Sequence, residues 1–237
     1  MNFVARKKVV LIIVEGPSDD EALALVFTNF YKQYSQSVMV HVVHGDITTE
    51  LSGKSQTIRN RVTDVIRYHA NVNKFTNEDY AQIIHLIDTD GAFVDEKFVI
   101  QDDTADLPIY SIQDIKTKNK SGIVQRNMLK SHNLNELSVI KNIWKIIPYK
   151  VYYMSCNLDH VLYDKQNSTD SDKEDCAHKF AKKYKDDLDG FISFISNSSF
   201  SVKLGYKDSW NFIKTGLNSL NRYSNLHICF QSENSEK

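Results

Sequence analysis

The sequence predicts an α/β fold, in which helices flank a parallel β-sheet and a mainly helical extension follows at the C-terminus. Residues 9–14 and 81–87 are short apolar runs rich in β-branched side chains, as expected for strands that are buried on both faces. Helical patterns separate these runs, and alternating strands and helices are typical of parallel sheets. Acidic residues follow both runs directly, which places them at the carboxyl edge of the sheet, where such folds bind ligands.

The composition is that of a soluble globular protein. Of the 237 residues, 41% are hydrophobic and 25% are charged, and the net charge is −1. This charge does not favour strong nonspecific binding to nucleic acid, although a local basic surface would still support it. No apolar run approaches the ~20 residues of a membrane span, and the three cysteines are widely spaced, as free cytoplasmic thiols are. We therefore expect a cytoplasmic protein that does not bind a membrane.

In the first half of the chain, strands and helices are expected to alternate as β-α-β-α-β. Ser18 and Glu21 have the spacing of a capping box, which predicts a helix with Ser18 as its N-cap. In the second helix, Arg61 lies off the apolar face, together with the neighbouring arginines. The expected elements are strands at 9–14, 38–43 and 81–87, and helices after Ser18 and from about Ser55 to Tyr68.

In the second half of the chain, residues 95–120 have a polar and irregular pattern. A fourth strand at 151–154 leads through Cys156 into a helix that begins near Asp159. The other expected elements are helical stretches at 123–129, 134–143 and 177–195, a loop at 165–175, a last helix capped by Asp208, and a strand at 226–230.

Three carboxylates stand at the predicted carboxyl edge of the sheet. Glu15 opens the segment Glu15-Gly16-Pro17-Ser18-Asp19 after the first strand, and Asp88-Thr89-Asp90 follows the third. Asp88 and Asp90 are two positions apart, which directs both to the same face of a strand. Oxygen ligands of this kind suit Mg²⁺, and one or two such ions can neutralise a phosphate, activate water and stabilise a leaving oxygen. We expect Glu15, Asp88 and Asp90 to form a catalytic site that binds Mg²⁺ or Mn²⁺.

These two motifs resemble those of the Toprim domain (topoisomerase–primase), which carries a glutamate after its first strand and an Asp-x-Asp after its third. They are most similar to the nucleases of the overcoming-lysogenization-defect (OLD) and RloB-like groups, which act in prokaryotic antiviral defence. The resemblance covers about residues 8–163 and implies a catalytic domain at 1–163 with a helical extension at 164–237 packed on it. It implies a Rossmann-like sheet and a Mg²⁺-dependent endonuclease, in which Glu15 is a metal ligand or a general acid–base group.

The resemblance also implies further site residues and a partner. Asp19 matches an extra acidic residue of the OLD-type motif, and Asp159 stands where RloB-like proteins carry another, so both are expected at the metal site. The alternative interpretation of Asp19 and Asp159 is that each is a carboxylate that stabilises the start of a helix. Lys203 or Lys207 would supply the basic residue near the metals. An ATPase partner is expected to control the nuclease by docking on residues 177–230, whose aromatic side chains can also be explained as core.

The candidate nucleic-acid-binding cluster consists of four basic residues, Lys116, Lys118, Lys120 and Arg126. A solvated loop is the alternative interpretation of this cluster. Gly53-Lys54-Ser55 does not complete a phosphate-binding P-loop, because Thr48 occupies the position of the required earlier glycine. His44 at a strand end is a weak candidate for chemistry, whereas His85 within a strand is expected to be packed.

Two other functions stay open. A binding module would hold a structural metal, or a nucleotide through metal, without hydrolysis. A phosphatase on the same fold would hydrolyse small phosphoesters and would not need a basic groove. DNA, messenger RNA and transfer RNA all stay open as substrates of a nuclease, and so does a homo-oligomeric assembly.

Overall fold

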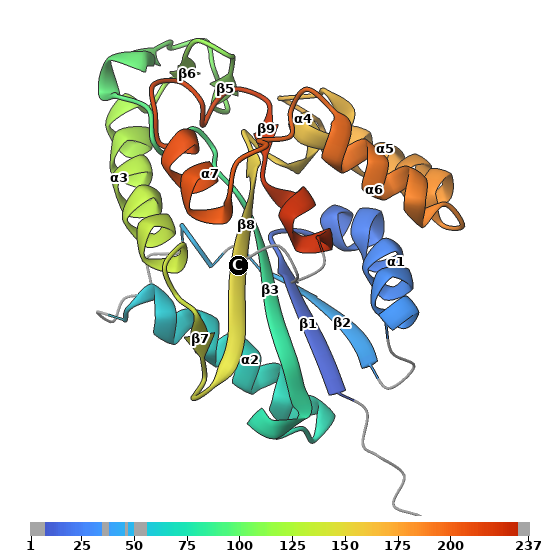
Figure 1. Ribbon diagram of the computed structural model, residues 1–237. Coiled ribbons are helices and arrows are strands. Elements are labelled where there is room, and N and C mark those ends of the chain that lie inside the picture. The colour runs from blue at the N-terminus through green and yellow to red at the C-terminus, as the bar shows by residue number, and fades with distance from the viewer. Residues whose placement is uncertain (1–7, 35–37, 46, 50–55, 232–237) are drawn as a thin grey trace, which may run out of the picture.

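The computed structural model describes residues 8–34, 38–45, 47–49 and 56–231, and a central sheet organises them (Figure 1). Its strands are β1 (Lys8–Val14), β2 (Val38–His44), β3 (Tyr80–Asp88), β7 (Asn142–Ile143), β8 (Ile147–Ser155) and β9 (Tyr223–Ser224). The strand order is β2-β1-β3-β8-β7, and β1, β2, β3 and β8 run parallel. The short strands β7 and β9 both pair antiparallel with β8. The predicted α/β fold is confirmed, with a sheet that is mixed and largely parallel.

Helices cover both faces of this sheet. One layer holds α1 (Pro17–Tyr34), α4 (Leu158–Tyr163), α5 (Asp170–Tyr184) and α6 (Leu188–Asn197), and the other holds α2 (Ile58–Asn73), α3 (Lys120–Leu137) and α7 (Tyr206–Ile213). Along β1, Val10 and Ile12 pack into the first layer, and Leu11 and Ile13 pack into the second. Because both faces are covered, this strand is apolar at every position from Val9 to Val14, which explains its unbroken hydrophobic run.

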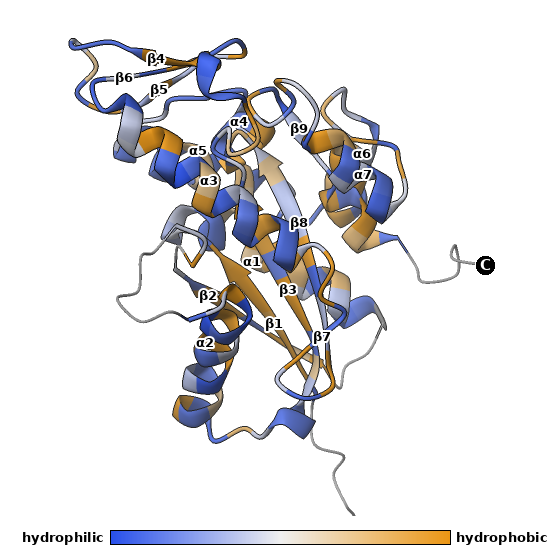
Figure 2. Cartoon of the chain, turned by 90° about the vertical axis from the view of Figure 1, so that its left-hand side faces the viewer, coloured by the Kyte–Doolittle hydropathy of each residue, from blue (hydrophilic) through white to orange (hydrophobic). Residues whose placement is uncertain are grey.

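A second sheet lies within residues 95–120, where the pattern predicted irregular structure, and this prediction is wrong. The segment contains a 3₁₀ turn, η2 (Glu96–Phe98), and the strands β4 (Val99–Gln101), β5 (Ile109–Tyr110) and β6 (Ile115–Thr117). β6 pairs parallel with β4 and antiparallel with β5. Figure 2 shows this sheet at one end of the molecule, beyond the end of α3. Strands of two or three residues are too short to show the alternation on which sequence prediction depends.

The first helix begins one residue before the predicted capping box. Pro17 is the first residue of α1, a position that proline favours because the N–H it lacks would have no intrahelical partner. Asp19 then accepts a hydrogen bond of 3.0 Å from the backbone N–H of Gly16, which closes the helix start. Glu21, the predicted cap partner of Ser18, instead pairs with His178 of α5 at 3.2 Å.

The second helix also begins later and extends further than predicted. Thr57 is its N-cap, and its side chain accepts a hydrogen bond from the backbone N–H of Asn60. The predicted start at Ser55 lies outside the described residues. Arg61 is buried and donates a hydrogen bond of 2.8 Å to the carbonyl of Ile47, whereas the pattern placed it off the apolar face. A segment after β2 therefore binds this helix face through its backbone.

Three helix boundaries after residue 120 differ from the prediction. The two stretches at 123–129 and 134–143 form one helix, α3, which ends at Leu137. The stretch at 177–195 is two helices, because Asp187 caps a new helix, α6, by accepting a hydrogen bond from Gly190. α5 begins at Asp170, within the predicted loop 165–175. Polar residues such as Ser, Thr and Asp favour both loops and helix starts, so their pattern does not distinguish the two.

The end of the described chain is helical, not extended. Residues Leu226–Phe230 form a 3₁₀ helix, η3, where a strand was predicted, and β9 precedes it. Gly205 is the N-cap of α7, and Asp208 lies in its first turn. A further 3₁₀ turn, η1 (Asn77–Asp79), precedes β3.

No helix within the described ranges has the length and apolar character that crossing a membrane requires.

The C-terminal helices build core on both faces of the sheet. Phe191 of α6 packs with α1 and β1 in one layer, and Trp210 of α7 packs with β8 in the other. Phe194, Phe212 and Tyr223 are partly buried against the same two clusters. The aromatic side chains of the C-terminal helices are therefore explained by packing.

The division of the chain after residue 163 and the docking role of residues 177–230 stay predictions.

Candidate active site

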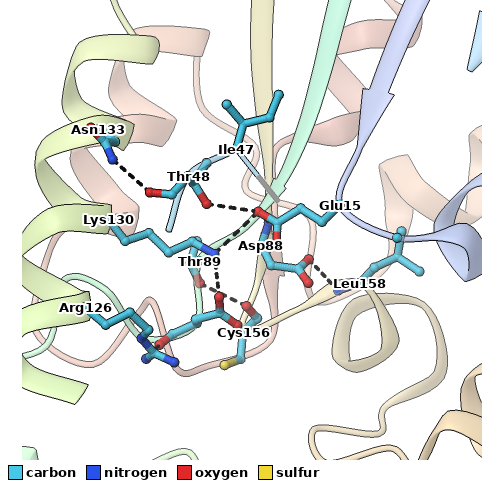
Figure 3. A network of polar contacts seen from close by, with 12 residues as sticks. Glu15, Ile47, Thr48, Asp88, Thr89, Arg126, Lys130, Asn133, Cys156 and Leu158 are labelled. Atoms are coloured by element: carbon cyan, nitrogen blue, oxygen red, sulfur yellow. Dashed lines mark hydrogen bonds and ion pairs between the residues drawn. The ribbon is translucent and has the colours of Figure 1, made fainter. Parts of the chain in front are cut away.

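Glu15, Asp88 and Asp90 lie at the carboxyl edge of the sheet, where β1 and β3 are neighbours (Figure 3). Glu15 is the first residue after β1, and its Oε1 accepts a hydrogen bond of 3.1 Å from the backbone N–H of Asp88, the last residue of β3. Asp90 follows two residues later in the turn that leaves β3. The structure thus brings the three predicted carboxylates to one edge, as adjacent parallel strands should.

A buried lysine of α3 bridges two of these carboxylates. The Nζ of Lys130 lies 3.4 Å from Oε1 of Glu15 and closer still to Oδ2 of Asp90. The side chain of Lys130 is 0% exposed, whereas those of Glu15 and Asp90 are 13% and 22% exposed. An ammonium group without water needs such partners, because the desolvation of an isolated charge is costly. Figure 3 shows Lys130 reaching from α3 toward Glu15.

The segment after β2 contributes Thr48 to the same centre. Its Oγ1 donates a hydrogen bond of 3.4 Å to Oε1 of Glu15, and its carbonyl accepts one of 2.8 Å from the side-chain amide of Asn133 on α3. Lys130 therefore holds Glu15 directly, and Asn133 holds it through Thr48. This places Ile47 and Thr48 between α3 and the end of β1, as Figure 3 shows.

Asp88 lies at the centre of the negative charge. Its Oδ1 accepts a hydrogen bond of 2.9 Å from the backbone N–H of Leu158, the first residue of α4. Burial raises the pKa of Asp88 well above its usual range, and the nearby negative charge of Glu15 raises it further. Asp19 and Asp90 act in the same direction, and Lys130 acts against them. The ionised form of Asp88 is therefore unfavourable unless a further cation balances its charge.

Asp19 and Asp159 form the outer part of this acidic centre. Burial raises the pKa of Asp19 to about 6, although its hydrogen bond from Gly16 lowers it, and the negative charge of Asp159 raises it further. Asp159 is buried in the first turn of α4, and this burial raises its own pKa. The two carboxylates are thus near enough for their charges to interact. Both also stand in the first turn of a helix, the alternative role that the sequence left open.

The turn that follows β3, residues 88–91, has a left-handed backbone at two positions. The φ angle is +46° at Asp90 and +67° at Gly91. A Cβ atom at Gly91 would lie 2.6 Å from Cδ2 of Leu220, so the turn requires glycine there. The backbone N–H of Asp90 donates to the carbonyl of Cys156 at 2.8 Å, and its carbonyl accepts from the guanidinium of Arg126 at 2.8 Å. These contacts direct the Asp90 side chain toward Lys130.

A C-terminal segment, Leu217 to Leu220, supports this acidic turn from inside the protein. The carbonyl of Ser219 accepts hydrogen bonds from the hydroxyl of Thr89 at 2.7 Å and from the backbone N–H of Gly91 at 3.1 Å. The Oγ of Ser219 accepts another, of 3.3 Å, from the N–H of Phe93. Thr89 and Ser219 are both 0% exposed. The geometry of the acidic residues thus depends on a segment that sequence reasoning assigned to the extension.

The predicted basic residues have different surroundings in the structure. Arg126 contacts the acidic turn and also donates to the hydroxyl of Tyr110 on β5. Lys118 is paired with Asp106 at 2.8 Å, and both are largely exposed. Lys116 is exposed on β6, and Lys120 is the first residue of α3. The cluster is therefore only partly a free basic surface, because Arg126 has a structural role at the site.

Sequence reasoning missed Lys130, and its candidates for a basic residue were Lys203 and Lys207. The structure places both of these exposed, in and before α7, and it is Lys130 that contacts the carboxylates. The signal was present, because Arg126, Lys130 and Asn133 recur at spacings of four and three and so share one face of a helix. The prediction of two separate helices at 123–129 and 134–143 concealed this polar stripe.

The two histidines do not join this centre. His85 is 0% exposed inside β3, and its Nδ1 lies 2.8 Å from the hydroxyl of Tyr149. It is packed, as expected for a histidine within a strand. His44 is exposed at the end of β2.

The donors at this edge suit a divalent cation in kind, although they do not form a finished ligand set. Carboxylate oxygens are what Mg²⁺ and Mn²⁺ prefer, and the excess of negative charge around Asp88 favours a bound cation. In the described part of the chain, however, no three acidic, histidine or cysteine side chains are already grouped to hold a metal ion. Lys130 instead pairs with both Glu15 and Asp90, and its single positive charge offsets one of their two negative charges. Metal binding would therefore have to compete with this lysine.

Comparison with known proteins adds no relative. No model of a protein family, no curated protein and no solved structure matches this chain. The resemblance to Toprim nucleases therefore rests on the two motifs that contain Glu15 and Asp88-Thr89-Asp90. A functional proposal has to come from the chemistry of the site.

Proposed function

We propose that this chain is a Mg²⁺- or Mn²⁺-dependent nuclease, which hydrolyses phosphodiester bonds with a centre formed by Glu15, Asp88 and Asp90. The observation that carries the proposal is the meeting of these carboxylates at the carboxyl edge of a largely parallel sheet. Asp19 adds to their charge, and so much buried negative charge is unfavourable unless a cation balances it. The resemblance of both motifs to Toprim nucleases supports the same assignment.

A bound divalent ion would supply the neutralisation of the phosphate, the activation of water and the stabilisation of the leaving oxygen. Glu15, Asp88 and Asp90 would hold it, with Asp19 and Asp159 as the next carboxylates. The protein's own groups prepare these ligands. The N–H of Leu158 orients Asp88, and Lys130 fixes the side chains of Glu15 and Asp90.

Basic residues on and after β6, together with Arg126, are the proposed contacts to the substrate backbone. Lys116 lies on β6, Lys118 follows this strand, and Lys120 is the first residue of α3, which also carries Arg126. The ion pair of Lys118 with Asp106 is exposed, and such pairs contribute little, so phosphate can replace the carboxylate. A net charge of −1 makes such local basic residues necessary for binding nucleic acid.

The test of the proposed function is cleavage by the purified protein of single- and double-stranded DNA and RNA. We expect cleavage with Mg²⁺ or Mn²⁺ and none with Ca²⁺, because the longer and looser coordination of Ca²⁺ positions water poorly. Glu15→Gln and Asp88→Asn should each reduce cleavage by at least about 100-fold, with an unchanged fold. Asp186→Asn, at an exposed carboxylate between α5 and α6, is the matched control and should cleave normally. Undiminished cleavage by Glu15→Gln would refute the assignment.

A second candidate is a module that binds metal or nucleotide without hydrolysis. The observation in its favour is that Lys130 already pairs with Glu15 and Asp90 and offsets one of their two charges, so that the centre depends less on a bound ion. Calorimetric Mg²⁺ binding that is lost in Asp88→Asn, together with no cleavage of any nucleic acid, would support this alternative. Hydrolysis of small phosphoesters alone would indicate a phosphatase.

We also propose that another protein controls this nuclease, since an unregulated nuclease would damage its host. The resemblance to defence-associated nucleases suggests an ATPase in this role and antiviral defence as its setting. Co-purification from cells that express the neighbouring genes tests the partner. Activity that is equal with and without those proteins would contradict this part of the proposal.

A further inference from the structure

A groove of about 320 Å³ lies between α3 and the segment that follows the acidic turn, residues 92–99. Its apolar lining includes Phe93, Val124 and Met128, and its polar lining includes Glu96 and Asn135. Its volume is within the range of small-ligand sites, which combine apolar walls with a few polar groups that fix orientation.

The groove and the acidic centre share a helix and a turn. Asn127 lines the groove, and its side-chain amide donates a hydrogen bond of 3.3 Å to the carbonyl of Gly91. The preceding residue, Arg126, donates to the carbonyl of Asp90. On α3, Arg126 and Lys130 belong to the face that contacts the acidic turn, and Val124 and Met128 belong to the groove. The groove and the acidic centre therefore adjoin the same turn and lie on different faces of α3.

The lining chemistry selects a neutral, planar ligand. No lysine, arginine or histidine is among the lining residues in the part of the chain that the structure describes, and the ammonium group of Lys214, 6.0 Å from the ring centre of Phe93, lies outside this lining. Phe93 offers an aromatic side chain that is half-buried, and unpaired bases are commonly recognised by stacking on such rings together with hydrogen bonds to their edges. A nucleobase fits this combination, and the phosphate attached to it would remain outside, on the side of the acidic centre.

The carboxylate of Glu96 decides which base fits best. A carboxylate only accepts hydrogen bonds, so it favours an edge that presents donors. Guanine presents its N1–H and its 2-amino group side by side, and both can reach one carboxylate. Adenine and cytosine present a ring acceptor beside their amino group, and uracil places its single N–H between two carbonyls, so each of them would set an acceptor against Glu96.

We propose that this groove binds an unpaired guanine base, with Phe93 as the stacking surface and Glu96 as the acceptor for N1–H and the 2-amino group. The link from base binding to cleavage rests on the proposed nuclease function, whereas the binding itself does not. As part of a nuclease, the groove would favour cleavage of single-stranded nucleic acid next to a guanine.

Calorimetric titration of the full chain with GMP and with IMP, in a buffer that contains EDTA, tests the groove without any metal. IMP differs from GMP by the missing 2-amino group, so the wild-type protein should bind GMP about tenfold more tightly, as expected for a hydrogen bond to a charged group. Glu96→Gln should remove most of this difference, and Phe93→Ala should weaken both ligands. Glu136→Gln, at an exposed glutamate of α3 that pairs with His132, should change nothing.

Equal binding of GMP and IMP, no binding of either, or a preference that survives Glu96→Gln would overturn the proposal. A second measurement separates it from the proposed function, namely the sequence at the cleaved ends of single-stranded RNA and DNA. Binding as expected without cleavage of nucleic acid would leave the groove assigned and the nuclease function refuted. Cleavage without a guanine preference, combined with no GMP binding, would refute the groove and leave the nuclease function intact.

Discussion

The hydroxyl group of Thr89 donates a hydrogen bond of 2.7 Å to the backbone carbonyl of Ser219, 130 residues further along the chain. Thr89 stands between the two aspartates of the acidic turn, so this contact ties the orientation of Asp88 and Asp90 to the C-terminal segment. Both residues are 0% exposed, and no solvent competes for the bond. The C-terminal region is in this sense part of the site.

Replacing Thr89 by valine tests this connection. Thr89→Val keeps the shape of the side chain and removes its donor, which should lower the free energy of unfolding by about 1–2 kcal/mol. Urea denaturation measures the change. Thr28→Val is the matched control, because the Thr28 hydroxyl bonds the carbonyl of Ala24 within its own helix at a less buried site. Equal losses in the two variants would show that the contact with Ser219 has no special importance.

Lys130 should matter to stability more than an exposed lysine does. Lys130→Met removes the cation from between Glu15 and Asp90, and their carboxylates then repel each other in a site with little water. The free energy of unfolding should fall by about 2–4 kcal/mol at neutral pH. Lys118→Met breaks an exposed pair and should cause little change, so an equal effect of both substitutions would contradict the role of Lys130.

Addition of Mg²⁺ offers a further check on the Lys130 variant. If the lysine and a metal ion compete for the same carboxylates, Mg²⁺ should raise the melting temperature of Lys130→Met more than that of the wild-type protein. Equal shifts in the two proteins would show that ion binding is independent of the lysine.

Gly91 should tolerate no side chain. Gly91→Ala would combine a φ of +67° with a Cβ only 2.6 Å from Leu220, so the turn or the leucine has to move. We expect a loss of about 2 kcal/mol or more in the free energy of unfolding. Gly205→Ala is the control, since its φ is −61° and its Cβ would meet no atom within 4 Å. A chain that accepts both substitutions equally would contradict the strained turn.

A histidine pair should make stability depend on pH. Burial lowers the pKa of His69 to about 4, and His41, whose Nδ1 lies 3.0 Å from Nε2 of His69, lowers it further. An unfolded chain protonates histidine near a pKa of 6.5. As the pH falls from about 6.5 to about 4, the unfolded state therefore binds a proton that the folded state does not, and stability falls.

The variant His69→Gln isolates this effect. Its stability relative to the wild-type protein should rise by about 1 kcal/mol between pH 7 and pH 5, a value reduced for the water that screens the half-buried pair. Urea denaturation at both pH values measures it. His132→Gln, which replaces an exposed histidine of α3, is the matched control. A pH profile that His69→Gln leaves unchanged would contradict the role of the pair.

The sequence determined the order of the main elements and the position of the acidic residues along it. The strands around Val9–Val14 and 81–87 could be recognised because burial on both faces requires an unbroken apolar run. Glu15 and Asp88 could be placed at one edge because parallel strands end on the same side. These features are local, or follow from chain direction, so a one-dimensional pattern contains them.

Tertiary structure alone decided which residues complete the site. Lys130 meets Glu15 and Asp90 only because α3 packs beside the ends of β1 and β3, and Ser219 meets Thr89 only through the folding of the C-terminal segment onto β8. Such contacts join segments far apart in sequence, and their partners are single polar residues without periodicity. A buried charge or carbonyl is stable only beside its partner, and that partner exists only once the chain has folded.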